Sequence, residues 1–149
     1  MRAAFLAVVA LAGFCLAEDG AEARYIGGTV AAVPSDARGV LRTTDDIFLE
    51  FRCRGRQVHV PYDRVNLLEY GQNVNRRLAL AIVISPMFLL SKSRKHFLTI
   101  GYTDHEGKQQ AMVFQVDKSK IRPVLVSLEA RTGQRVQYQD DEARKAGKG

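Results

Sequence analysis

The feature that most constrains this chain is an apolar segment near its middle, residues 78–90, which contains no charged side chain. Basic residues flank it on both sides: Arg76, Arg77, Lys92, Arg94 and Lys95. As a helix the segment would be about 20 Å long, which is too short to cross the roughly 30 Å hydrocarbon core of a bilayer. It must therefore lie in the domain's own core, against a second protein, or in the outer leaflet of a membrane.

The sequence does not decide among these three environments for residues 78–90. An apolar run of this length is more often a buried core segment than a membrane segment. An exposed run, in contrast, would be a patch large enough to require a partner. Apart from Ser85 the segment has no polar face, so it matches poorly to a helix lying in the membrane surface. Pro86 removes a backbone donor and restricts Ser85, so we expect a helix over residues 75–84, a break, and a second short piece.

The N-terminus has the layout of a secretory signal peptide. Arg2 precedes an apolar run that ends in small residues at Cys15 and Ala17, which predicts a signal over residues 1–17, cut after Ala17. The run is shorter than the roughly 20 residues that an uncleaved anchor needs. A lipidated Cys15 is the alternative, although Phe14 stands where a small residue is expected. We therefore expect an exported protein that is periplasmic, envelope-associated or secreted.

Size and charge narrow the class of protein further. The 149 residues suffice for one domain, and the formal net charge of +6 favours anionic partners such as phospholipid headgroups. Removal of the signal would leave Cys53 as the only cysteine, which excludes a disulfide scaffold. We expect an anionic membrane surface or an unknown protein as partner, and no nucleic acid.

About six segments have the residue pattern of β-strands joined by hairpins. In residues 47–53 the side chains of Ile47, Leu49, Phe51 and Cys53 fall on one face, which is typical of a half-buried strand. Turn residues separate these segments. The fourth segment is expected to stop at Pro61 and to resume as a strand after a bend. The predicted strands are 25–33, 39–43, 47–53, 57–61 resuming at 65–70 after a break at 61–64, 97–103 and 110–116.

The C-terminal part of the chain changes to a helical pattern. Ile121, Val124, Leu125 and Leu128 share one face of a helix, which Asp117 or Ser119 can cap and which Gly133 ends. Val136 and Tyr138 alternate with Gln and predict a short last strand. Residues 18–24 and 139–149 are small or charged, and we expect a disordered lead and a disordered charged tail.

This order of elements resembles the pleckstrin-homology-like fold, including bacterial PH and GRAM-type domains. The resemblance implies a mostly β domain of the α+β class over residues 25–138. It would have a curved antiparallel sheet or partly open barrel, a C-terminal amphipathic helix, and an apolar helical insert at 75–93, before the fifth strand. The motifs at 25–29, 68–72 and 94–100 are also similar to a group of small secreted bacterial proteins of unknown role.

Neither resemblance carries a known active site, and one departure from lipid-binding PH-like domains matters. Domains that bind phosphoinositides usually carry a cluster of Lys and Arg in the first hairpin loop, whereas residues 34–38 offer only Arg38, close to Asp36. Phosphoinositide binding is therefore not supported.

The sequence contains no phosphate-binding Gly-rich loop, no Gly-x-Ser-x-Gly elbow and no paired-cysteine metal pattern. His59, His96, His105 and Cys53 lack the close spacing of zinc ligands, so we expect no metal and no cofactor. We expect His59 to point away from the core and Cys53 to be a packed side chain.

We therefore predict a non-enzymatic exported binding or scaffold module that docks on a membrane surface or protein partner. The alternative is a small enzyme or ligand-binding protein with a pocket between helix and sheet. Convergence of ionisable residues from distant strands in one cleft would favour that alternative. The predicted docking residues are Arg76, Arg77, Leu80, Ile84, Met87, Phe88, Leu89, Lys92, Arg94 and Lys95.

Overall fold

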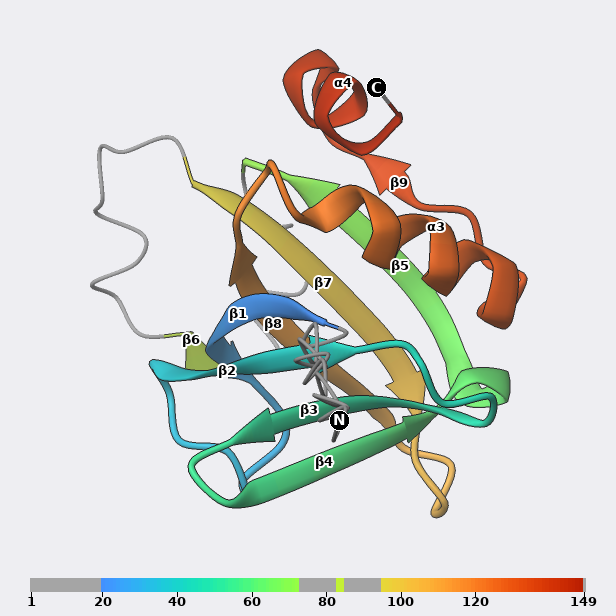
Figure 1. Ribbon diagram of the computed structural model, residues 1–149. Helices are drawn as coiled ribbons and strands as arrows, with labels where there is room; N and C mark the ends of the chain where they lie inside the picture. Colours follow the sequence, from blue (N-terminus) through green and yellow to red (C-terminus); the bar gives the residue numbers. More distant parts are fainter. Residues whose placement is uncertain (1–19, 73–82, 85–94, 149) are drawn as a thin grey trace, which may run out of the picture.

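The computed structural model describes residues 20–72, 83–84 and 95–148, and the expected signal peptide lies outside this range. Within these residues nine strands form one sheet, accompanied by two α-helices and one short 3-10 helix (Figure 1). The elements are β1 (Ala21–Gly28), β2 (Ala37–Arg42), β3 (Phe48–Cys53), β4 (Arg56–Pro61), η1 (Tyr62–Arg64), β5 (Val65–Gly71), β6 (Val83–Ile84), β7 (His96–Thr103), β8 (Gln109–Val116), α3 (Ile121–Thr132), β9 (Gln137–Tyr138) and α4 (Asp141–Lys148). The mostly β, α+β class that the sequence predicts is therefore confirmed.

The sheet is open and runs in the order β4-β3-β2-β1-β8-β7-β5-β9, with β6 paired to β1. Neighbouring strands are antiparallel except β5 and β9, which are parallel. The first strand of the chain thus lies near the middle of the sheet, between β2 and β8.

The two predicted hairpins, β3–β4 and β7–β8, are present, and the residues of their turns account for the chain reversals. The turn between β3 and β4 contains Arg54 and Gly55 at φ 44° and 76°, the positive values that a two-residue hairpin turn requires. In the turn between β7 and β8, Asp104 Oδ1 accepts hydrogen bonds from the backbone N–H groups of Glu106 and Lys108, both at 2.9 Å. Gly107 completes that turn at φ 80°.

The interruption predicted at residues 61–64 is confirmed, because η1 separates β4 from β5. The two segments are nevertheless separate strands in opposite halves of the sheet, and not one strand that resumes after a bend. Pro61 ends β4 at one sheet edge, because proline cannot donate to a further ladder. This division and the addition of β6 raise the strand count above the predicted six. The short last strand predicted from Val136 and Tyr138 is present as β9.

Three further expectations differ from the structure. Residues 21–24, expected in a disordered lead, belong to β1, which ends at Gly28 rather than at residue 33. Ile47 precedes β3 and is 70% exposed, because the Asp45 carboxylate accepts hydrogen bonds from the N–H groups of Ile47 and Phe48 and turns the chain there. Val83–Ile84, expected at the end of a helix, forms β6 and pairs with β1.

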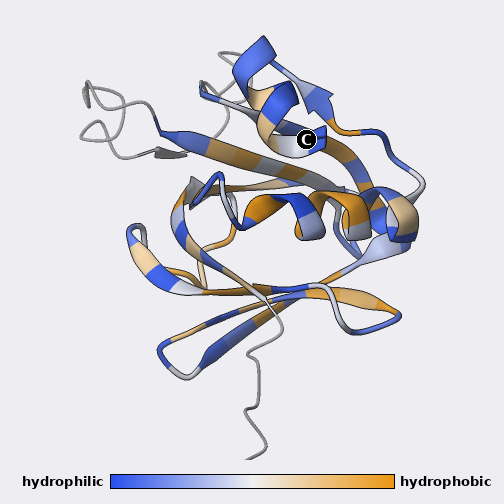
Figure 2. Cartoon of the chain, turned by 45° about the horizontal axis from the view of Figure 1, so that its top comes forward, coloured by the Kyte–Doolittle hydropathy of each residue, from blue (hydrophilic) through white to orange (hydrophobic). Residues whose placement is uncertain are grey.

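The core contains the inward faces of both halves of the sheet and the apolar face of α3. The rings of Tyr25 on β1, Phe51 on β3 and Phe114 on β8 meet at its centre, with centroid distances of 4.8 to 6.4 Å. Figure 2 shows the orange side of α3 turned toward the sheet. The predicted helix face is confirmed, since its four apolar side chains are buried: Ile121, Val124, Leu125 and Leu128.

The ends of α3 agree with the sequence only at the C-terminus. Gly133 adopts φ 70° and donates its N–H to the carbonyl of Glu129, as a left-handed C-cap does. At the N-terminus the cap position is Lys120, without a side-chain hydrogen bond. Asp117 instead accepts hydrogen bonds from Ser119 in the preceding turn.

The predicted disordered tail is mostly helical. Asp140 Oδ1 accepts a 2.7 Å hydrogen bond from the N–H of Ala143, which caps α4, and its Oδ2 accepts a 3.2 Å bond from the N–H of Gln72. Ala143 is buried against the core. These contacts attach α4 to the end of β5. None of the helices in the described residues is long and apolar enough to cross a membrane.

Candidate functional site

The structure describes two of the ten predicted docking residues. Ile84 lies in β6, where its backbone pairs with Gly27, and Lys95 lies directly before β7. The other eight lie outside the described residues: Arg76, Arg77, Leu80, Met87, Phe88, Leu89, Lys92 and Arg94.

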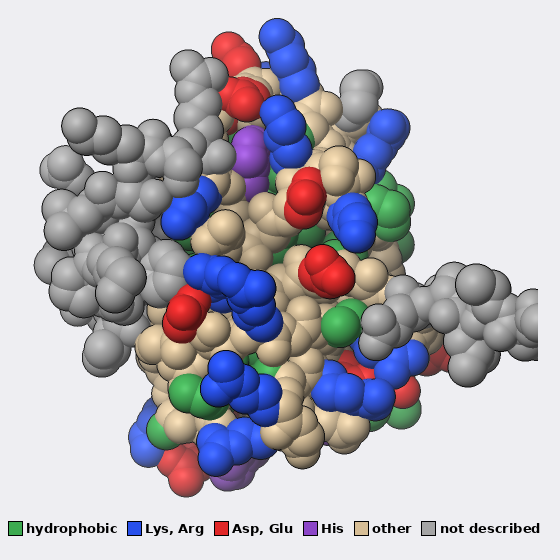
Figure 3. Space-filling view, turned by 60° about the vertical axis from the view of Figure 1, so that its left-hand side comes forward, with side chains coloured by type: hydrophobic (Ala, Val, Ile, Leu, Met, Phe, Trp, Pro, Cys, Tyr) green, Lys and Arg blue, Asp and Glu red, His purple; other side chains and the backbone are tan. Residues whose placement is uncertain are grey.

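Lys95 belongs to the rim of a cleft of about 890 Å³, the candidate site of this protein. The cleft lies over β1 and β2, the start of β7 and the residues that follow β8, and α4 borders it. Figure 3 shows basic and acidic side chains around the hollowed middle of this side of the molecule. Its ionisable lining residues are Glu22, Arg24, Arg38, Lys95, His96, Asp117, Lys118 and Glu142.

Two arginines lie side by side in the cleft. Arg24 on β1 is directly opposite Arg38 on β2 and opposite Gln115 on β8. Side chains at directly opposite positions of antiparallel strands share one face of the sheet and come within about 5 Å at their Cβ atoms. We name Arg24 and Arg38 the basic row.

Two carboxylates lie next to the basic row. Glu22 precedes Arg24 by two residues on β1 and therefore shares its face of the sheet. Asp117 follows Gln115 by two residues, just beyond the end of β8, and also lines the cleft. We name Glu22 and Asp117 the acidic row. The basic and acidic rows are thus adjacent, and the other ionisable lining residues are Lys95, His96, Lys118 and Glu142.

The charges in these rows differ in how they are compensated. The Arg24 guanidinium lies 3.1 Å from the Asp36 carboxylate. Arg38 and Glu22 are exposed, and their side chains make no hydrogen bond or ion pair in the part of the chain that the structure describes. Asp117 Oδ1 accepts hydrogen bonds from Ser119 Oγ at 2.7 Å and from its N–H at 2.8 Å. These bonds hold the pKa of Asp117 below its usual value, so it is anionic at neutral pH.

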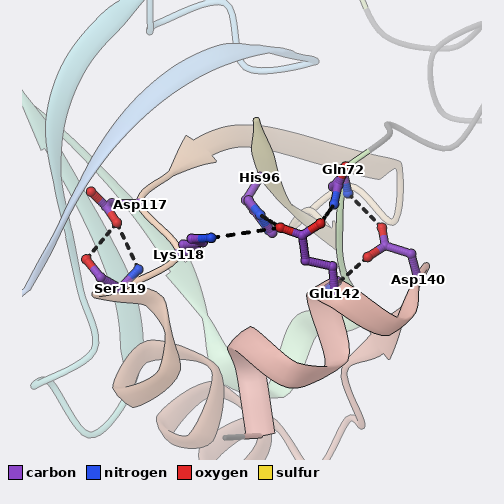
Figure 4. Close-up of polar contacts among 8 residues, drawn as sticks. Gln72, His96, Asp117, Lys118, Ser119, Asp140 and Glu142 are labelled. Atoms are coloured by element: carbon purple, nitrogen blue, oxygen red, sulfur yellow. Dashed lines mark hydrogen bonds and ion pairs between the residues drawn. The ribbon is translucent and has the colours of Figure 1, made fainter. Parts of the chain in front are cut away.

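The wall formed by α4 is held by a polar network around Glu142 (Figure 4). Gln72 Nε2 donates a 2.6 Å hydrogen bond to Glu142 Oε2, while Lys118 Nζ lies 3.8 Å and His96 Nε2 3.9 Å from Oε1. His96 is only 5% exposed and stacks on the Tyr70 ring at 5.5 Å. Its Nδ1 atom has no hydrogen-bond partner within the described structure. This network joins β5, β7 and α4 at the end of the cleft.

The arrangement is suited to binding charged groups. Guanidinium groups hold phosphate and carboxylate through paired N–H donors, and carboxylates hold ammonium groups. The described lining residues include no serine, threonine or cysteine that could act as a nucleophile. Among the described residues no group of three His, Cys, Asp or Glu is placed to hold a metal ion.

Most of this cleft is not predictable from the sequence. Arg24 falls in the expected disordered lead and Glu142 in the expected disordered tail. The available signal was the turn over residues 34–36, which brings β2 back along β1 and sets Arg38 opposite Arg24. No local pattern indicated that α4 would return to His96. The histidine and cysteine expectations that the structure tests are correct, since His59 is exposed and Cys53 is buried.

Comparison with known proteins adds no relative: no family model matches this chain, and neither does any curated protein.

Proposed function

We propose that this protein is an exported, non-enzymatic binding module that docks on a membrane surface through the cleft, including Lys95 on its rim. The observation that carries the proposal is the basic row, in which Arg38 lacks any partner in the described structure and faces the solvent next to Arg24. Lys95, the last residue of the basic flank predicted to dock, lines the same cleft. Removal of the expected signal takes away Arg2 and leaves 21 − 16 = +5, and this net positive charge attracts the protein toward anionic headgroups.

We also propose that the fold is of the PH-like type. An antiparallel sheet whose inner face packs against the C-terminal amphipathic helix α3 supports this assignment. Since fold does not determine function, the docking role depends on the cleft and not on the resemblance.

Flotation with anionic liposomes tests the docking role. A basic residue near an anionic surface contributes about 1 kcal/mol, so Arg38→Glu should weaken binding by about 2 kcal/mol, or roughly 30-fold. Arg135→Glu is the matched control, because Arg135 is also exposed and lies outside the cleft. We expect the control to retain most of the binding. If both variants lose the same amount of binding, the loss comes from the change in net charge alone. That result would contradict a docking site in the cleft.

The insert has its own test. A variant carrying Leu80→Glu and Leu89→Glu should float less than the wild type if residues 78–90 contact the membrane. If wild type and variant both stay in the soluble fraction as folded monomers, membrane docking is wrong and a protein partner becomes the better proposal.

A ligand-binding protein or small enzyme is the second candidate, and one observation favours it. Ionisable side chains from β1, β2, β7 and α4 converge in one cleft, which is the arrangement expected for that alternative. The test is turnover of chromogenic ester and phosphate substrates by the wild type and by Glu142→Gln. Turnover that disappears in the variant would identify an enzyme; a catalytically inactive protein agrees with the binding module.

A further inference from the structure

We propose that the cleft recognises a zwitterion made of a phosphate and a primary ammonium group, as in a phosphoethanolamine headgroup. The basic row would hold the phosphate and the acidic row the ammonium. This inference names the ligand class of the cleft and rests on the proposed membrane-docking function.

The basic row is the phosphate side of the site. Like charges placed directly opposite on adjacent strands repel each other, and Asp36 compensates only Arg24. An anion between the two guanidinium groups would remove this repulsion. Arginine is also the side chain whose planar fork fits phosphate oxygens best.

The acidic row is the ammonium side. Glu22 is an exposed carboxylate without a hydrogen bond or ion pair in the described structure, and Asp117 is held in its anionic form nearby. The charges of Lys118 and Lys120 act on Asp117, so Glu22 carries the larger part of the preference. The Glu22 carboxylate repels a ligand that carries only negative charge and attracts one with a positive end, so the cleft favours a zwitterion over a simple anion.

The spacing of the rows selects among zwitterions. Two residues along a strand place Glu22 about 7 Å from Arg24 at their Cα atoms. In phosphoethanolamine, phosphorus and nitrogen are four bonds apart, or about 5 Å at roughly 1.5 Å per bond with bent angles. Long Arg and Glu side chains can close on both ends of such a ligand. In an α-amino acid the carboxylate and ammonium share one carbon, so such a ligand spans less of the distance between the two rows.

The lining also distinguishes ethanolamine from choline. Quaternary ammonium groups are bound by the faces of aromatic rings, and the described lining residues include no Phe, Tyr or Trp. A primary ammonium donates three hydrogen bonds, which the carboxylates of the acidic row can accept.

Titration of the full chain with soluble glycerophosphoethanolamine, glycerophosphocholine and inorganic phosphate, followed by NMR chemical shifts, tests the ligand class. We expect glycerophosphoethanolamine to bind about tenfold more tightly than glycerophosphocholine, as one charge-assisted contact would provide. Glu22→Gln should remove this preference and should not weaken inorganic phosphate binding, because the substitution removes a negative charge that repels the anion. Arg38→Gln should weaken all three, and thermal unfolding verifies that both variants fold. Equal affinity for the two glycerophosphodiesters, or a preference that survives Glu22→Gln, overturns the inference.

Flotation with vesicles shows whether the ligand is a membrane headgroup or a soluble molecule. It also distinguishes failure of the ligand assignment from failure of the docking function. Phosphatidylcholine vesicles with and without phosphatidylethanolamine have the same net charge, so stronger flotation with ethanolamine supports headgroup recognition. Arg38-dependent binding to anionic vesicles without an ethanolamine preference overturns the inference and retains the docking function. Binding of soluble glycerophosphoethanolamine without flotation on any vesicle supports the ligand class and overturns docking. The absence of both kinds of binding overturns both proposals.

Discussion

Replacing Phe51 by alanine tests whether the two halves of the sheet share one core. Phe51 is 0% exposed on β3, and its ring lies 4.8 Å from Phe114 on β8 and 6.4 Å from Tyr25 on β1. Truncating a buried phenylalanine costs about 3–5 kcal/mol, which includes the two aromatic contacts and the cavity left behind. Domains of this size are stable by about 5–15 kcal/mol, so the change removes a large part of the total.

Urea unfolding followed by circular dichroism measures this effect. With a slope of about 2 kcal/mol per molar urea, a loss of about 4 kcal/mol lowers the midpoint by about 2 M. Phe48→Ala is the matched control, since Phe48 is on the same strand, only partly buried, and contacts the His59 ring instead of the core rings. We expect it to lose about 1 kcal/mol. A loss below about 1 kcal/mol for Phe51→Ala, or equal losses in both variants, would refute a core shared by β3 and β8.

Three further substitutions test single groups. Burial raises the pKa of Tyr25 from 10.0 to about 12, so the stability it contributes is fully present below pH 10 and is lost as pH rises toward 12. The free energy of unfolding should fall by about 1.4 kcal/mol at pH 11. Urea unfolding at pH 9 and pH 11 should show a smaller difference between the two pH values in Tyr25→Phe than in the wild type. The same difference in both proteins would contradict burial of this hydroxyl. The Tyr70 hydroxyl is buried without a hydrogen-bond partner in the described structure. Tyr70→Phe should therefore leave the free energy of unfolding unchanged or raise it by up to about 1 kcal/mol. A decrease of more than about 1 kcal/mol would show that the hydroxyl has a partner. Gly133→Ala should cost about 1 kcal/mol in thermal unfolding because Gly133 has φ 70°, and a neutral result would mean that α3 ends elsewhere.

The parts of the fold that the sequence predicts correctly are those determined by local patterns. The helix α3 follows from apolar residues at helical spacing, and its end from Gly133. The hairpins follow from turns at Gly55 and Gly107, where glycine accepts the positive φ that most residues avoid. Residues near each other in sequence decide these features, so no long-range information is needed.

The parts that could not be predicted depend on pairing between distant segments. Residues 21–24 have a weak strand propensity and become a strand because β2 and β8 bind them on both sides. The sequence shows Pro61 as a bend, but only the sheet order reveals that β4 and β5 lie in opposite halves. The cleft has the same origin, since His96 and Glu142 meet only after α4 docks beside β5. Contacts between such distant segments cannot be predicted from the pattern of neighbouring residues.

The central place of β1 in the sheet has a consequence for the order of folding. Its residue Ala23 pairs with Val116 of β8 across most of the length of the chain, and within the described residues β8 is followed by α3, β9 and α4. Non-local pairing of this kind is slow to form, because the loop between the partners must close first. During synthesis, β1 therefore keeps one unpaired edge until β8 has been released. Truncation before residue 109 would leave that edge exposed permanently and favour aggregation over folding.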